Sequence, residues 1–152
     1  MTRVRMKLLM LLFVAGFAAK GQPLPDRDTA TVNRLNDESK SLVGSDSSKA
    51  ISLAMQAREI AAEIEYPKGE AYALKNLGLV YFMKAKYPET LDYWNPSLQI
   101  FETIKDDVGI SNMLSNIGAV YLTQGADTKA LEYMLKSLQL AEKIGDTLRM
   151  YT

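Results

Sequence analysis

Apolar residues recur at helical spacing through most of the chain from about residue 28 onward. Leu74, Leu77 and Tyr81 lie three or four positions apart, so a helix would place them on one face. The same spacing runs through six segments that pair into hairpins, at about 28–43 and 48–65, 68–84 and 88–105, and 107–124 and 128–144. No segment alternates apolar and polar residues over any length, as a half-buried strand would. The pattern therefore predicts an all-α fold without a sheet.

Residues that begin and end helices stand at the expected breaks. Pro88 suits the first turn of a helix, where its missing N–H is not needed. Asp46 or Ser47, and Asp127, can accept hydrogen bonds from the free N–H groups that open a helix, and Asp106 and Asp146, at equivalent junctions between repeats, can cap the helix that follows. Gly125 suits a helix end. These residues support the boundaries that the apolar spacing predicts.

The sequence also repeats itself with a period of 40 residues. Leu-Gly-Leu-Val-Tyr at 77–81 returns as Ile-Gly-Ala-Val-Tyr at 117–121, and the match extends well beyond these five positions. A fixed period of this length indicates stacked supersecondary units that bury a common core. The repeated glycine allows the second helix of a hairpin to approach the first closely. The chain is therefore expected to stack helix hairpins.

These residues resemble the tetratricopeptide repeat in its 40-residue form. With repeats at about 31–70, 71–110 and 111–150, the matching residues are Leu74 and Leu114, Leu77-Gly78 and Ile117-Gly118, Tyr81 and Tyr121, and Ala50 and Ala130. The resemblance implies a right-handed α-solenoid over residues 31–145. It also implies a non-catalytic scaffold that binds a protein or an extended peptide. In the first repeat, Asp37-Glu38 and Ser41 replace Leu-Gly and Tyr, as expected for a polar capping helix.

The N-terminus has the layout of a secretory signal peptide. Arg3, Arg5 and Lys7 precede the uncharged stretch 8–19, and small residues follow up to Gly21. Twelve residues of helix rise only about 18 Å, short of the roughly 30 Å apolar core of a bilayer. We therefore expect cleavage near Gly21, an extended leader over 22–30, and a periplasmic or extracellular protein. The alternative is an uncleaved membrane anchor.

Composition narrows the possible chemistry. The chain has no cysteine and no histidine, which removes thiolate sites, the commonest general base and the commonest metal ligand. Without residues 1–21, 14 basic residues face 18 acidic ones, so the formal charge is −4. A mildly acidic domain argues against nucleic acid as a partner. We expect no catalytic residue, no cofactor, no metal and no membrane span in the mature chain.

Two acidic pairs are candidate functional sites. Glu59 and Glu63 are spaced i,i+4, as on an ordinary solvated helix face. Asp106-Asp107 could hold a cation, but no further ligands follow at a defined spacing, so a helix cap is the better interpretation.

The candidate binding residues lie on the first helix of each hairpin. Asn36, Asn76 and Asn116 recur at the sixth position of the three repeats, which faces the concave groove in proteins that this sequence resembles. An asparagine amide can both donate to and accept from a peptide backbone. The other residues expected on this face are Tyr72, Lys75, Phe82, Asn112 and Ser115. The alternative is that the asparagines are merely solvated or bond the adjacent helix.

The C-terminal residues 146–152 match the junction that precedes each repeat, so they read as the start of a truncated fourth repeat. This leaves a second functional hypothesis, in which the chain is the sensory input domain of a larger signalling protein such as a histidine kinase, a nucleotide cyclase or a DNA-binding regulator. A third repeat without a following repeat or capping helix is also expected to self-associate through its C-terminal end. The residues expected there are Tyr121, Leu140, Ile144 and Leu148.

Overall fold

The computed structural model describes residues 26–150, with side chains up to residue 145. Within this range the chain forms six helices and no strand. The helices are α2 (Thr29–Leu42), α3 (Ser47–Glu63), α4 (Pro67–Met83), α5 (Tyr87–Thr103), α6 (Asp107–Thr123) and α7 (Asp127–Met150). The expected signal peptide lies outside the described residues.

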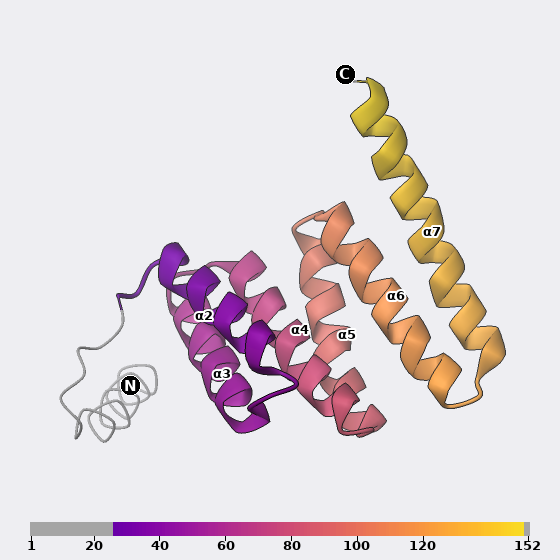
Figure 1. The fold of residues 1–152 in the computed structure, drawn as a ribbon. Helices are drawn as coiled ribbons and strands as arrows, with labels where there is room; N and C mark the ends of the chain where they lie inside the picture. Colours follow the sequence, from indigo (N-terminus) through magenta and orange to yellow (C-terminus); the bar gives the residue numbers. More distant parts are fainter. Residues whose placement is uncertain (1–25, 151–152) are drawn as a thin grey trace, which may run out of the picture.

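The helices form three antiparallel hairpins, α2–α3, α4–α5 and α6–α7, stacked in sequence order (Figure 1). Each second helix packs on the first helix of the next hairpin, α3 on α4 and α5 on α6, and α2 also touches α4. The expected all-α solenoid of helix hairpins is confirmed. Asp46 and Asp106 accept hydrogen bonds from the N–H groups of Lys49 and Gly109, each at 2.9 Å, so both cap their helices as expected.

The centre of the core is built around Trp94 of α5. Its side chain is 2% exposed, and its ring lies 5.5 Å from the ring of Phe82. The indole N–H donates to the carbonyl oxygen of Lys75 at 2.9 Å, so the polar atom of this buried side chain is satisfied. Gly78 lies against the indole, and a Cβ there would come within 2.3 Å of it. The repeated glycine therefore provides room for a tryptophan.

The first hairpin differs in register from the other two. Ser39 precedes Ala50 by 11 residues, whereas Gly118 precedes Ala130 by 12, so the connection between equivalent positions is one residue shorter in the first hairpin. Ser39 donates its hydroxyl hydrogen to the carbonyl oxygen of Ala50 at 2.8 Å. Gly118 occupies the equivalent place in the third hairpin, where an added Cβ would lie 3.3 Å from the carbonyl oxygen of Ala130. Ser39 therefore takes the place of the repeated glycine, and the alignment of α2 moves by one residue.

The predicted break near residue 145 is wrong. Helix α7 continues through Gly145 to Met150, so no turn of a fourth repeat begins at Asp146. A glycine inside a helix costs only about 1 kcal/mol relative to alanine. A turn there would give up helical hydrogen bonds, and no described helix packs beyond it to compensate. Figure 1 shows the end of α7 extending past the rest of the stack.

Candidate functional site

A polar pocket of about 300 Å³ lies between α2 and α4, which are the first helices of the first and second hairpins. Stacks of repeated hairpins commonly bind partners on extended concave surfaces. The lining residues are Asn33, Asn36, Asp37, Lys40, Tyr72, Lys75 and Asn76. We call this hollow the α2–α4 pocket.

Four of the eight residues proposed from the sequence meet in this pocket: Asn36, Tyr72, Lys75 and Asn76. Three further lining residues were not among those proposed from the sequence: Asn33, Asp37 and Lys40. The signal that could have found them is the spacing in the first hairpin, where Ser39 precedes Ala50 by 11 residues instead of the 12 that separate Gly118 from Ala130. With the one-residue shift, Asn33 and Asn36 correspond to Tyr72 and Lys75, and Asp37 corresponds to Asn76.

The two asparagines of the pocket connect α2 to α4. Asn36 donates its amide N–H to the carbonyl oxygen of Gly69 at 3.0 Å, and Asn76 donates to the carbonyl oxygen of Asn36 at 2.8 Å. Both side chains are at most 5% exposed. The Oδ1 atom of Asn36 is buried without a hydrogen-bond partner. In this conformation the amide donors hold the helices together, which is the alternative that the sequence had left open.

Lys75 is the principal charged group of the pocket. Burial lowers the pKa of its ammonium below the ordinary value of 10.5, and the charge of Lys40 lowers it further. The Lys75 ammonium lies 5.7 Å from the centre of the Tyr72 ring. Neither lysine forms an ion pair within the described residues. Asp37 offsets one of the two positive charges, so the lining keeps one net positive charge.

The other four proposed residues lie outside the pocket. Phe82 stacks on Trp94 and packs near Tyr87, at 5.5 and 6.0 Å between ring centres, so it belongs to the hydrophobic core region. Asn112 and Ser115 are exposed on α6, and Asn116 is half-buried. The Asn116 side chain forms no hydrogen bond within the described residues, in contrast to Asn76. Within the described residues, asparagine hydrogen bonds between first helices therefore join the first hairpin to the second but not the second to the third.

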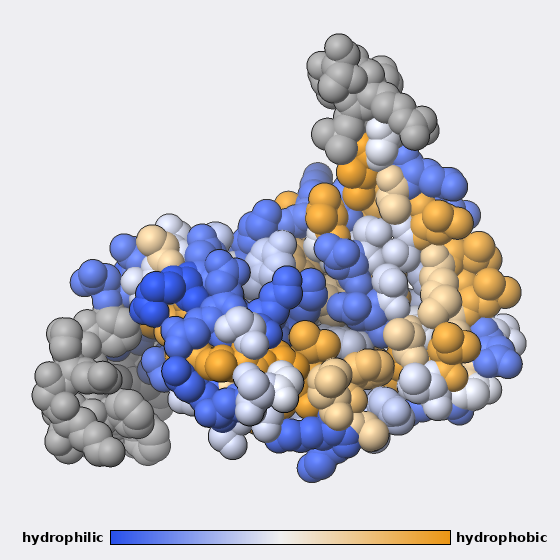
Figure 2. Space-filling view, in the orientation of Figure 1, coloured by the Kyte–Doolittle hydropathy of each residue, from blue (hydrophilic) through white to orange (hydrophobic). Residues whose placement is uncertain are grey.

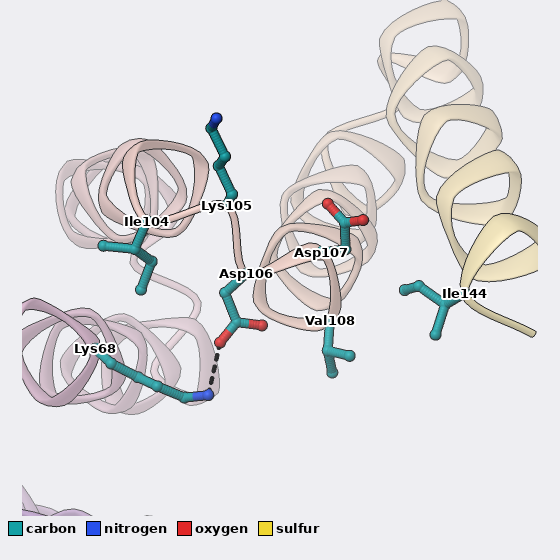
Figure 3. Close-up of a pocket in the computed structure, with 7 residues that line it drawn as sticks. All are labelled: Lys68, Ile104, Lys105, Asp106, Asp107, Val108 and Ile144. Atoms are coloured by element: carbon teal, nitrogen blue, oxygen red, sulfur yellow. Dashed lines mark ion pairs between the residues drawn. The ribbon is translucent and has the colours of Figure 1, made fainter. Parts of the chain in front are cut away.

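A second hollow, of about 470 Å³, lies where the second and third hairpins meet (Figure 3). Its two carboxylates are paired: Asp106 contacts Lys68 at 2.8 Å, and Asp107 contacts Lys143 of α7 at 3.5 Å. Partial burial raises the pKa of Asp106, but the hydrogen bonds from Lys68 and from the Gly109 N–H outweigh it and leave this pKa lowered. The ion pair with Asp106 correspondingly raises the pKa of Lys68. This hollow is a junction stabilised by ion pairs.

Over residues 26–150, no three acidic side chains are grouped so that they could hold a metal ion. No helix in that part of the chain is both long enough and apolar enough to cross a membrane.

Comparison with known proteins agrees with the helical repeat. Residues 69–143 match the family model of the tetratricopeptide repeat. The TPR domain of Arabidopsis FLU superposes with a TM-score of 0.67 at 23% identity, over 75% of this chain and 97% of that domain. BtubC from P. vanneervenii superposes with a TM-score of 0.62 at 18% identity, over 91% of this chain and 56% of the other. No curated protein gives a significant match.

The described helices thus have the fold of a tetratricopeptide-repeat domain, and residues 69–143 carry the sequence pattern of that repeat. Domains of this class are scaffolds that bind proteins or peptides.

Proposed function

We propose that the protein is a non-catalytic scaffold whose α2–α4 pocket binds an extended peptide segment that carries a carboxylate. The observation that carries this proposal is the half-buried, unpaired ammonium of Lys75, which the charge of Lys40 destabilises further. A buried charge without a partner is costly, and such groups concentrate at functional sites. A carboxylate would neutralise the one net positive charge of the lining and accept charge-assisted hydrogen bonds from the lysines.

The rest of the pocket suits a peptide backbone. Asn33 and Asp37 are exposed at the pocket, so they can exchange hydrogen bonds with the N–H and C=O groups of an extended chain. Tyr72 is half-buried, with its ring packed edge-on against Phe101 at 5.3 Å between ring centres. It offers a rigid apolar surface beside the charged groups. The roles of Asn36 and Asn76 are to fix the spacing of α2 and α4.

An array of ten-residue peptides tests the charge preference. Each peptide with Asp or Glu and a free C-terminus is matched with an amidated peptide that has Asn or Gln instead. We expect the wild type to prefer the acidic members and Lys75→Glu to weaken their binding at least tenfold, since a hydrogen bond to a charged group contributes about 1.5–3 kcal/mol. The control is Lys84→Glu, which changes an exposed lysine outside the pocket by the same charge. Equal binding of acidic and neutral peptides to the wild type would rule out this proposal.

Binding of the acidic peptide is expected to weaken as the pH rises. The pKa of Lys75 is lowered in the free protein, and a bound carboxylate would raise it again. The protonated form therefore binds the acidic peptide better, and the dissociation constant should rise as the pH increases through the lowered pKa. In Lys75→Met the dependence should be flatter over the same pH range.

We also propose that the scaffold acts after export from the cytoplasm. The support is the sequence alone: a basic start, an apolar stretch of 12 residues over 8–19, and small residues up to Gly21. Expression of the chain from its own start should give a mature product that begins near Gln22. N-terminal sequencing that finds Met1 or Thr2 on the mature protein would refute export by cleavage.

A further inference from the structure

The outer side of α7 carries an apolar stripe. Leu131, Leu135 and Leu138 are 59%, 47% and 54% exposed and lie at i, i+4 and i+7, on one side of the helix. Figure 2 shows hydrophobic residues gathered along this helix. The residues expected from the sequence at this end are placed differently. Tyr121, Leu140 and Ile144 are half-buried, and the side chain of Leu148 lies outside the described residues.

Two of these three positions belong to an interface between helices elsewhere in the molecule, whereas the counterpart of Leu135 is Asn95, which is exposed on α5. Leu91 and Leu98 of α5 are the counterparts of Leu131 and Leu138, 40 residues earlier. Both are half-buried against the core cluster that includes Met113 and Ile117 of the following helix α6. The α7 stripe thus contains two positions, those of Leu131 and Leu138, of the type that packs a neighbouring helix, and no described helix covers it. We propose that it binds the same stripe of a second copy of this chain.

The opposite end of the stack argues for a symmetric pair rather than a head-to-tail chain of copies. Helix α4 presents Ala73, Leu77 and Val80, all buried, and Ala73 and Val80 pack in clusters with residues of the first hairpin. After the one-residue shift, the counterparts on α2 are Arg34, Glu38 and Ser41.

These α2 side chains are polar, and both Arg34 and Lys49 form ion pairs with Glu38, at 3.6 and 3.2 Å. Covering them with leucines would remove charges from water without a new partner. The apolar surface that remains as a match for the α7 stripe is the same stripe of a second copy. Packing of the two stripes gives a closed two-fold dimer.

The charges beside the stripe favour an antiparallel arrangement. Lys136 contacts Glu132 of the same helix at 2.7 Å, so this edge presents a neutral pair to the other copy. Glu142 lies seven residues beyond Leu135. In an antiparallel pair centred on Leu135 the two Glu142 residues lie about 20 Å apart, whereas a parallel pair would bring like charges together. The stripe spans about 10 Å of helix, well below a standard interface, so the dimer should be weak.

Sedimentation velocity of the whole chain tests the pairing. Between about 10 μM and 1 mM, the range of a small interface, we expect a concentration-dependent shift from monomer to dimer. Leu131→Glu and Leu138→Glu should each weaken dimerisation at least tenfold. The control is Met55→Glu, because Met55 is a 49% exposed apolar residue at the position of α3 that corresponds to Leu135. A chain that stays monomeric throughout, or a dimer that Leu138→Glu does not affect, would overturn the proposal.

Cross-linking tests the arrangement, and the chain suits it because it has no cysteine of its own. Leu135→Cys should form an intermolecular disulfide under mild oxidation, since the two-fold axis brings both copies of this residue together. Met55→Cys, exposed to a similar degree, should remain monomeric. Equal cross-linking of the two variants, or none in either, would contradict the antiparallel pair. The outcome is independent of peptide binding, which uses α2 and α4.

Discussion

Replacing Trp94 by alanine is expected to lower the free energy of unfolding by about 3–5 kcal/mol, the range for buried Trp or Phe truncated to alanine. The indole is 2% exposed, so its removal leaves a cavity between α4 and α5. It also removes the ring stacked on Phe82 and the donor to the Lys75 carbonyl oxygen. Urea unfolding followed by circular dichroism measures this change.

A second variant separates the volume of the indole from its hydrogen bond. Trp94→Phe keeps an aromatic ring and loses the N–H that bonds the Lys75 carbonyl. It should cost clearly less than Trp94→Ala, because a neutral hydrogen bond contributes only about 1 kcal/mol net. A loss below 1 kcal/mol in Trp94→Ala would mean that the indole is not the central side chain of this core.

The second large effect is expected at the repeated glycine, and it should differ between two equivalent positions. In Gly78→Ala the new Cβ would lie 2.3 Å from two atoms of the Trp94 ring, which is buried and cannot swing away. Overpacking of this kind costs about 1–3 kcal/mol, partly offset by the helix preference of alanine, about 1 kcal/mol. The variant should therefore be destabilised.

Gly118→Ala is the matched control, at the same position of the next hairpin. Its new Cβ would lie 3.1 Å from Cγ of Met134, a flexible and half-buried side chain that can move. The clash should be small, and alanine's helix preference should leave the stability nearly unchanged. If the two alanine variants unfold at the same urea concentration, Gly78 does not act by leaving room for the Trp94 ring.

The sequence could predict the second and third hairpins because each helix there carries its own strong pattern. Gly78 and Gly118 mark the close approach of paired helices, and Asp106 caps α6 as its position predicted. The first hairpin was harder to align, since Ser39 stands in place of the glycine and precedes Ala50 by one residue fewer than Gly118 precedes Ala130. Without the glycine, the sequence of the first repeat has no residue that would reveal a one-residue shift of α2 relative to α4 and α6.

The candidate site depended on that alignment. Asn36 was matched with Asn76, but in the structure it corresponds to Lys75, and the two asparagines bond across the helices instead of facing one another in a row. Asp37 and Lys40 were missed for the same reason. The continuation of α7 could not be predicted either, because Gly145 and Asp146 are compatible with both a turn and a helix. Tertiary packing, which decides such cases, is not visible in a local pattern.

The most direct test of the central claim is a titration of the ¹⁵N-labelled protein with the acidic peptide that binds best on the array, followed by NMR. Binding in the α2–α4 pocket predicts that the largest chemical-shift changes fall on residues of α2 and α4 around Asn33, Lys40 and Lys75. Lys75→Glu should abolish these changes and Lys84→Glu should preserve them. Changes centred on α7 or on the hollow around Asp106, with the α2–α4 pocket unaffected, would contradict the account.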